Sequence, residues 1–182
     1  MLVNNERRAV RVTLARMSWS EPVERVAAYA REAGAELRVE EFGEGTPTAR
    51  EAAQAIGCEL GAIGKSLVFD CDGRYVLVLV PGDRRADPDK VARATGVARA
   101  RVASVEEVEQ ATGFAPGAVA PFPLRGVERV LVDPLLLAHP VVWVGAGTDR
   151  HMAALAPAEL VRLTRAQSVD TVSDAPPGTI HR

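Results

Sequence analysis

The stretch that decides the fold is residues 63–80, IGKSLVFDCDGRYVLVLV. Two runs rich in leucine, β-branched and aromatic residues, 63–69 and 75–80, flank the polar link Asp70-Cys71-Asp72-Gly73. An Asp-Gly pair in a short link between two such runs is a strong signal for a β-hairpin. Because residues 76–80 are apolar on both faces of an extended chain, they predict a strand in the centre of its sheet.

Helical patterns lie on both sides of this hairpin. Upstream, apolar residues recur at helical spacing after Ser20, which is expected to cap that helix, and the capping box of Thr48 with Glu51 opens a second helix. Downstream, the capping box of Ser104 with Glu107 opens another. The expected helices are about 20–34, 48–57, 88–96, 104–113 and 157–165, and the expected further strands are about 37–42, 130–132 and 141–144.

Strands and helices are mixed along the chain without the regular alternation of a parallel α/β sheet. A chain of 182 residues suits one domain. We therefore expect an α+β fold, a single domain over residues 19–173 with a mixed central β-sheet flanked by helices. Residues 1–18 have no clear period and are expected to form an N-terminal extension, and residues 174–182 a flexible tail.

The composition argues against several classes of protein. No apolar run reaches the roughly 20 residues that cross a bilayer, and the amino terminus lacks the apolar segment of a secretory signal, so we expect a cytoplasmic protein without a membrane partner. Cys58 and Cys71 are too far apart for a CxxC motif, and the 3 histidines lack metal-ligand spacing. A formal net charge of −2 argues against binding nucleic acid by overall charge alone, and no DNA partner is expected.

Lysine is rare in this chain, because only Lys65 and Lys90 among its 22 basic residues are lysines. In the predicted first strand, alternation places Lys65 on the more apolar face, together with Ile63 and Leu67. A buried ammonium is costly unless it is paired or functional, because burial disfavours the charged form. Two interpretations stay open: a functional lysine directed into a site, or a lysine near the sheet edge whose stem packs while its amine reaches water.

A second candidate region is the segment 113–122, GFAPGAVAPF, which we call the glycine–proline segment. Its glycines and prolines fix an irregular backbone path, and glycine permits close approach of a ligand to backbone N–H groups. Such donors can bind an ester carbonyl or orient a water molecule. Gly117, Ala118 and Pro121 are its candidate residues. The alternative interpretation is a rigid surface connection.

Four further candidates follow predicted strands. Gly145 and Gly147 lack the third glycine of a dinucleotide-binding fingerprint, so a plain turn is the simpler interpretation. His151, close behind them, could line a pocket, although a lone histidine is more often structural. Asp133 is expected to cap the residues after its strand or to face the site. The chain contains no GxSxG elbow and no phosphate-binding P-loop.

Several of these stretches together resemble the YbaK/ProX family, which includes the editing domain inserted in bacterial prolyl-tRNA synthetases. They are residues 48–53, TAREAA, residues 64–69, GKSLVF, residues 80–83, VPGD, the segment 112–122, and Val132-Asp133. The resemblance covers about residues 22–172 in unbroken order, and no single motif carries it.

The resemblance implies a free-standing, trans-editing deacylase. Such a protein hydrolyses the ester between a small amino acid, such as alanine, cysteine or serine, and the terminal ribose of a tRNA, with tRNA(Pro) as the expected carrier. Lys65 matches the family's lysine, which holds the terminal phosphate or adenosine end of the substrate. Residues 117–121 match its GxxxP loop, whose backbone positions the ester and a water molecule. The implied partners are the aminoacylated acceptor end of tRNA and prolyl-tRNA synthetase, and no metal or organic cofactor is implied.

On this basis Lys65 and Gly117 are the expected catalytic residues. The expected substrate-binding residues are Thr48, Ser66, Ala118, Pro121, Asp133, Gly145, Gly147 and His151. The chain departs from the cysteinyl-tRNA deacylase branch at Thr48, where that branch carries an aromatic residue, and near Met152, where it tends to be acidic, which argues against cysteine as the substrate. The alternative function is a non-catalytic binding or regulatory module for aminoacylated tRNA or an adenosine-like ligand.

Overall fold

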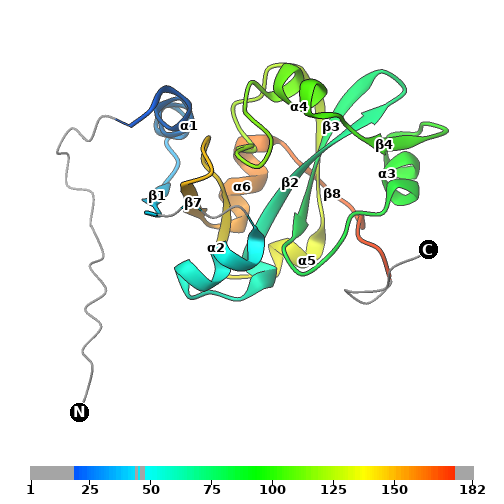
Figure 1. Ribbon diagram of the computed structural model, residues 1–182. Coiled ribbons are helices and arrows are strands. Elements are labelled where there is room, and N and C mark those ends of the chain that lie inside the picture. The colour runs from blue at the N-terminus through cyan, green and yellow to red at the C-terminus, as the bar shows by residue number, and fades with distance from the viewer. Residues whose placement is uncertain (1–18, 44, 46–47, 175–182) are drawn as a thin grey trace, which may run out of the picture.

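The computed structural model describes residues 19–43, 45 and 48–174. These residues form one mixed sheet of eight strands with helices packed around it (Figure 1), which confirms the α+β fold that the sequence predicts. The extension expected at residues 1–18 and all but the first residue, Asp174, of the tail expected at residues 174–182 lie outside the described residues. No helix in the described part of the chain is both long enough and apolar enough to span a membrane.

The hairpin predicted from residues 63–80 is the centre of the sheet. Strand β2 (Ile63–Cys71) pairs antiparallel with β3 (Arg74–Pro81). The link between them is shorter than the sequence suggests, because only Asp72 and Gly73 lie outside the strands, at φ values of 55° and 81°. Positive φ at both positions is typical of a tight type I′ turn, for which Asp-Gly is a preferred pair.

Six shorter strands complete the sheet. They are β1 (Arg38–Glu41), β4 (Ala100–Val102), β5 (Val127–Val132), β6 (Val142–Gly145), β7 (His151–Leu155) and β8 (Gln167–Ser168). The spatial order is β1-β7-β6-β2-β3-β5-β8, and β4 pairs with β2. The pairs β2/β6, β3/β5 and β5/β8 are parallel and the others antiparallel. Strand β3 therefore lies between two neighbours, as its apolar sequence predicts.

The five predicted helices begin and end close to where the sequence predicts them, and the structure adds the short helix α5 and a 3-10 turn. The helices are α1 (Glu21–Glu32), α2 (Ala49–Ile56), α3 (Pro88–Thr95), α4 (Val105–Thr112), α5 (Pro134–Leu137) and α6 (Pro157–Thr164), with a 3-10 turn at Leu60–Ala62. Both predicted capping boxes are present, Thr48 with Glu51 and Ser104 with Glu107. Ser20 is the N-cap residue of α1, as predicted, but its hydroxyl makes no capping hydrogen bond and only its carbonyl accepts helical N–H groups.

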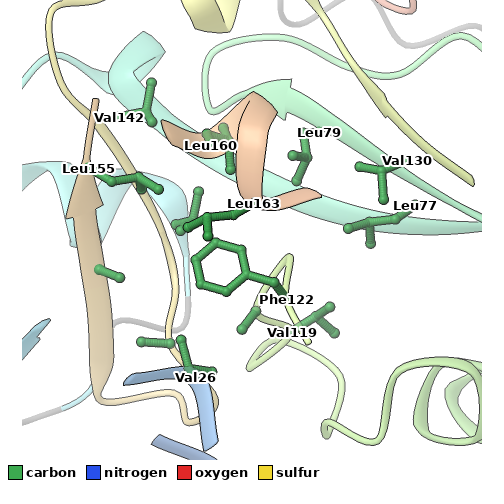
Figure 2. Close-up of a cluster of buried hydrophobic side chains, with 14 of the residues drawn as sticks. Val26, Leu77, Leu79, Val119, Phe122, Val130, Val142, Leu155, Leu160 and Leu163 are labelled. Carbon is green, nitrogen blue, oxygen red and sulfur yellow. The ribbon is translucent and has the colours of Figure 1, made fainter. Parts of the chain in front are cut away.

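Both faces of the sheet are buried. On one face, alternate residues of the central strands pack against α1, α6 and the glycine–proline segment, and Figure 2 shows Phe122 near Leu163 and Val119 in this cluster. The other face carries two separate clusters. One joins α2 to β6 and β7 around Trp143, and the other joins α3 and β4 to the central hairpin around Phe69. The space between these two clusters is where the site described below lies.

The sequence does not predict strands β4, β7 and β8. Strands β4 and β8 contain only 3 and 2 residues, too few for a periodic signal. Strand β7 is buried at every position and contains two alanines, so it has neither alternation nor a strong strand propensity. This omission matters for the site, because β7 carries both His151 and Met152.

Candidate active site

A pocket with a volume of about 360 Å³ lies beside the first half of β2. Its other walls come from the first turns of α2, the glycine–proline segment, the end of β6 and the start of β7. The residues that line it are Thr48, Ala49, Ala52, Ile63, Gly64, Lys65, Ser66, Leu67, Gly117, Val119, Gly145 and Met152. The pocket therefore brings together five of the predicted site residues, Thr48, Lys65, Ser66, Gly117 and Gly145.

The pocket lies at a gap in the pairing of β2. On the side away from β3, β2 pairs with β6 at Ile63 and Gly64, and with β4 from Phe69 to Cys71. Between these contacts, no strand of the described residues pairs with residues 65–67 on this side. Because the neighbouring strands leave this length of β2 uncovered, α2 and the glycine–proline segment can approach it and enclose a concave space.

Lys65 lies between the two apolar clusters of its sheet face, which confirms its predicted place on the more apolar side of β2. Its side chain is partly buried, and its ammonium donates a hydrogen bond to the backbone carbonyl of Arg84. Burial lowers the pKa of Lys65 below its ordinary value, while the Asp83 carboxylate opposes this shift and the Arg85 guanidinium adds to it. The pocket thus holds a partly desolvated cation whose direction is set by a backbone acceptor.

Ser66, the next residue, carries a hydroxyl that has no hydrogen-bond partner among the described residues. Its hydroxyl oxygen is buried and makes no hydrogen bond within the described residues. A buried hydroxyl that lacks a partner costs about 1–3 kcal/mol. Ser66 lines the pocket, but its hydroxyl oxygen is buried, so a substrate reaches this hydroxyl only if the pocket wall moves.

The first turn of α2 forms one wall of the pocket. The Thr48 hydroxyl donates to Glu51 Oε2 at 2.6 Å and accepts from the Glu51 N–H at 3.2 Å, so the capping box is closed. This fixes a helix amino terminus, with its partial positive charge, at the pocket. Ala49 and Ala52 follow on the pocket side of the helix, and their small side chains leave the space open.

The glycine–proline segment forms the opposite wall and is irregular, as the sequence predicts. Gly117 has a φ of 81°, and the Ala118 N–H donates to the Ala115 carbonyl at 3.0 Å, which closes a turn around Gly117. Val119 follows and packs against the end of β6, where a side chain on Gly145 would collide with its carbonyl group. The turn therefore presents backbone, rather than bulky side chains, to the pocket.

Helix α1 holds this segment from outside the pocket. Arg25 donates a hydrogen bond to the Gly113 carbonyl at 2.8 Å, and its guanidinium lies 4.3 Å from the centre of the Phe114 ring. Tyr29 stacks on Phe122 with ring centroids 5.6 Å apart. Sequence reasoning missed Arg25, because a contact between residues so far apart in the chain leaves no local signal.

Four predicted site residues lie near the pocket walls without lining the pocket. Ala118 is buried, and Pro121 lines a different cavity next to Tyr29. Gly147 has a φ of 99° and packs against the backbone of Pro22 at the start of α1. His151 is buried, and its Nδ1 lies 2.7 Å from the Thr148 hydroxyl; burial lowers the pKa of this imidazole.

Asp133 also does not line the pocket, and its carboxylate accepts three hydrogen bonds from other residues of the protein. It accepts hydrogen bonds from the Leu135 N–H at 3.0 Å, from the Thr171 N–H at 2.8 Å and from the Thr171 hydroxyl at 3.3 Å. The first of these bonds caps α5, so the capping role expected for Asp133 is confirmed. Its second partner, Thr171, belongs to the last described part of the chain.

The remaining lining residues were not singled out as site candidates by the sequence. They are Ala49, Ala52, Ile63, Gly64, Leu67, Val119 and Met152. Most are apolar residues of regular elements, whose pattern is that of core positions, so only the three-dimensional gap beside β2 identifies them. Within residues 19–43, 45 and 48–174, no three histidine, cysteine, aspartate or glutamate side chains gather as a metal ion would require.

Comparison with known proteins identifies the family. The aminoacyl-tRNA editing domain family matches residues 43–163, a range that includes every residue lining the pocket. The chain belongs to this family, the YbaK/ProX family of editing domains.

Individual relatives agree with this assignment. The chain is 35% identical to the uncharacterised protein YwhH of Bacillus subtilis over 123 residues, 67% of this chain and 78% of that protein. It is 30% identical over 119 residues to the Escherichia coli K12 protein named multifunctional Ser/Thr-tRNA deacylase ProXp-y, 63% of this chain and 71% of that protein. It is 32% identical over 131 residues to proline–tRNA ligase of Nitratidesulfovibrio vulgaris, 71% of this chain but only 22% of the ligase.

A solved structure confirms the fold. The crystal structure of a candidate trans-editing enzyme for prolyl tRNA synthetase superposes on this chain with a TM-score of 0.80 and 40% sequence identity. The superposition covers 86% of this chain and 99% of that protein. The similarity therefore extends over nearly the whole described domain, not the pocket alone.

Proposed function

We propose that this protein is a trans-editing deacylase that hydrolyses the ester between a small, wrongly attached amino acid and the terminal ribose of a tRNA. The observation that carries the proposal is one pocket lined by Lys65, Ser66 and the turn at Gly117. Membership of the editing-domain family, and the name of the E. coli relative, support the same chemistry.

In this proposal Lys65 holds the nucleotide end of the substrate. An ammonium attracts a phosphate strongly when it is partly removed from water, because the local dielectric constant is lower than in bulk solvent. Among the described residues, Asp83 is the only carboxylate whose charge measurably raises the pKa of Lys65. The Arg84 carbonyl, which accepts from the ammonium, is neutral. The charge of Lys65 is therefore largely available to a terminal phosphate.

The reaction itself needs only water and a polarised ester. Water attacks the ester carbonyl carbon, the bond from that carbon to the ribose oxygen breaks, and the proton lost by water ends on the ribose hydroxyl. The products are the free amino acid and the uncharged tRNA. Backbone N–H groups of the Gly117 turn and the first turn of α2 would stabilise the negative charge that develops on the carbonyl oxygen. Because the ester is already activated, positioning and electrostatics suffice without a nucleophilic side chain.

The remaining lining favours a small amino acid. Ala52, Ile63, Val119 and Met152 form an apolar part of the pocket, whose whole volume of about 360 Å³ must also hold part of the ribose. Alanine and serine are therefore the first candidates, serine being supported by the name of the E. coli relative. Cysteine is disfavoured by Thr48 and Met152. The similarity to a trans-editing enzyme for prolyl tRNA synthetase supports tRNA(Pro) as carrier and the synthetase as a partner.

The test is deacylation of a panel of tRNAs charged with alanine, serine, cysteine or threonine. We expect selective turnover of one charged species, reduced at least tenfold in Lys65→Met. The matched control is Arg74→Met, which also removes one cation, from an ion pair with Glu128 at the opposite end of the central hairpin. A folded protein that binds charged tRNA yet hydrolyses no member of the panel would contradict the proposal and favour a non-catalytic binding module.

A further inference from the structure

The second lysine of the chain, Lys90 on α3, has a role different from that of Lys65. Its ammonium donates to Asp170 Oδ1 at 3.1 Å, to Asp170 Oδ2 at 2.9 Å and to Asp174 Oδ1 at 2.9 Å. Three bonds use all the donors of an ammonium. Both aspartates lie in residues 169–174, which we call the C-terminal strap and which follow the end of the family match at residue 163.

The strap is also bonded along its length to the core of the domain. The Val169 N–H donates to the Val132 carbonyl at 3.0 Å, at the end of β5. Thr171 is held on both sides, since it donates to the buried Asp133 carboxylate and its carbonyl accepts from the Asp87 N–H at 2.8 Å. Asp174, which the sequence places in the tail, is thus the last residue of an anchored segment.

The strap runs beside the backbone that receives the Lys65 hydrogen bond. Val172 forms an antiparallel β-bridge with Ala86, and the Ser173 N–H donates to the Arg85 carbonyl at 2.8 Å. The preceding residue, Arg84, supplies the carbonyl that accepts from the Lys65 ammonium. Figure 1 shows this last described part of the chain, in red, near the connection from β3 to α3.

We propose that the C-terminal strap, fastened to α3 by Lys90, fixes the position of the Lys65 ammonium through the Arg84 carbonyl. Lys90 and Asp133 are then positioning residues: neither lines the pocket, but both hold the strap. This proposal rests on the proposed function in one respect only, namely that Lys65 takes part in deacylation.

The physical reason is the flexibility of lysine. An ammonium at the end of a four-carbon stem has rotatable donors and no fixed geometry of its own, so its place depends on the acceptor that it finds. An error of about 1 Å in a group that positions a substrate can reduce the rate about 100-fold. The carbonyl of Arg84 is a well-fixed acceptor because the next two residues, Arg85 and Ala86, are bonded to the strap, whereas the same carbonyl in a free loop is not.

The scarcity of lysine gives a direct test. In the full chain labelled with ¹³Cε-lysine, Lys65 and Lys90 are the only lysine side chains, so Lys90→Met leaves the Lys65 signal alone. Burial lowers the pKa of Lys65 in the intact protein, with Asp83 and Arg85 as its charged neighbours. We expect Lys90→Met to move this pKa back toward the ordinary lysine value, because loss of the bonds to Asp170 and Asp174 loosens the strap beside Arg85 and lets water reach the ammonium. Lys90→Arg, which keeps the cation, and the control Arg74→Met should leave it in place.

The double variant Asp170→Asn/Asp174→Asn removes the same bonds from the strap side and should raise the Lys65 pKa in the same way. Both variants should lower kcat/KM for deacylation about tenfold. An unchanged Lys65 titration in either variant would overturn the proposal. Absence of deacylation in the wild-type protein would contradict the proposed function instead and would leave the titration result standing, so the two failures are distinguishable.

Discussion

Gly145 lies so close to Val119 that a methyl group on Gly145 would stand 2.7 Å from the Val119 carbonyl oxygen. Side-chain carbons do not approach a backbone oxygen this closely, and backbone cannot move aside as a flexible side chain can. The lack of a side chain at position 145 therefore sets how closely the glycine–proline segment approaches β6. Because Gly117 and Val119 of that segment line the pocket, Gly145 also sets the width of the site.

Gly145→Ala should therefore damage both the fold and the site. We expect a loss of about 1–3 kcal/mol in the free energy of unfolding, typical of an overpacked contact, and a fall in deacylation of at least tenfold. Gly126→Ala is the matched control, since its methyl group would meet its nearest neighbour at an ordinary 3.5 Å. Urea denaturation and the charged-tRNA assay check both effects, and wild-type activity in Gly145→Ala would disprove the role assigned to this contact.

The two capping boxes allow a comparison between stability and function. Thr48→Ala and Ser104→Ala each remove a hydroxyl that accepts from an N3 backbone N–H, so each should cost about 1 kcal/mol of stability. Only Thr48 is at the pocket. We expect deacylation to fall severalfold in Thr48→Ala, through loosening of the first turn of α2, and to stay unchanged in Ser104→Ala. If the two variants were equally active, the first turn of α2 would make no contribution to catalysis.

Ser66→Ala should have opposite effects on stability and on activity. The wild-type hydroxyl is buried and has no partner in the part of the chain that the structure describes, so its removal should leave the free energy of unfolding unchanged or raise it by about 1 kcal/mol. Activity should fall, because we expect substrate binding to move the pocket wall and to give this hydroxyl a hydrogen-bond partner. Thr164→Val gives the contrast, as its hydroxyl donates to the Leu160 carbonyl at 2.6 Å and lies outside the pocket lining. That variant should lose stability and keep its activity; a destabilised Ser66→Ala would mean that the hydroxyl has a protein partner in solution.

The sequence predicts the parts of the fold that depend on neighbouring residues. The Asp72-Gly73 turn and the capping box at Thr48 are local interactions, so the residues that make them stand next to each other in the chain. Strand β7 could not be recognised in this way, because its extended form is stabilised by pairing with β1 and β6 rather than by its own residues. The missing strand also hid Met152 on the pocket wall.

The same distinction applies to the candidate site. Lys65 stands out in the sequence because a lysine on an apolar strand face is costly, and Gly117 because glycine and proline impose an unusual backbone. The pocket itself arises from a gap between the strands that flank β2, and no residue pattern reports a gap. The acceptor of the Lys65 ammonium is a backbone carbonyl, so the identity of Arg84 gives no sign of it. Asp133, a predicted site residue, does not line the pocket; its carboxylate instead accepts a hydrogen bond from Thr171 of the C-terminal strap, which runs beside that acceptor.

The lowered pKa of Lys65 makes two quantities depend on pH with opposite signs. In the unfolded chain this lysine titrates near its ordinary value of 10.5, and burial lowers the pKa in the folded protein. Between those two pH values the unfolded chain binds more protons, so the contribution of Lys65 to stability rises with pH across that window. Binding of a phosphate by the ammonium runs the other way, because it is present below the folded pKa and is lost as the pH rises through it.

Binding of adenosine 5′-monophosphate, a small mimic of the terminal nucleotide of tRNA, tests whether phosphate affinity falls as the pH rises. We expect its affinity for the wild-type protein to fall as the pH rises through the folded pKa of Lys65, which burial places below 10.5, the ordinary lysine value. Lys65→Arg keeps a positive charge over this whole range, since a guanidinium stays protonated, so its affinity should show no such fall. Isothermal titration calorimetry at several pH values measures both curves. If the two proteins lose affinity in parallel, the titrating group lies elsewhere and Lys65 does not hold the phosphate; if only the wild type does, the partly buried ammonium is the group that binds the nucleotide end.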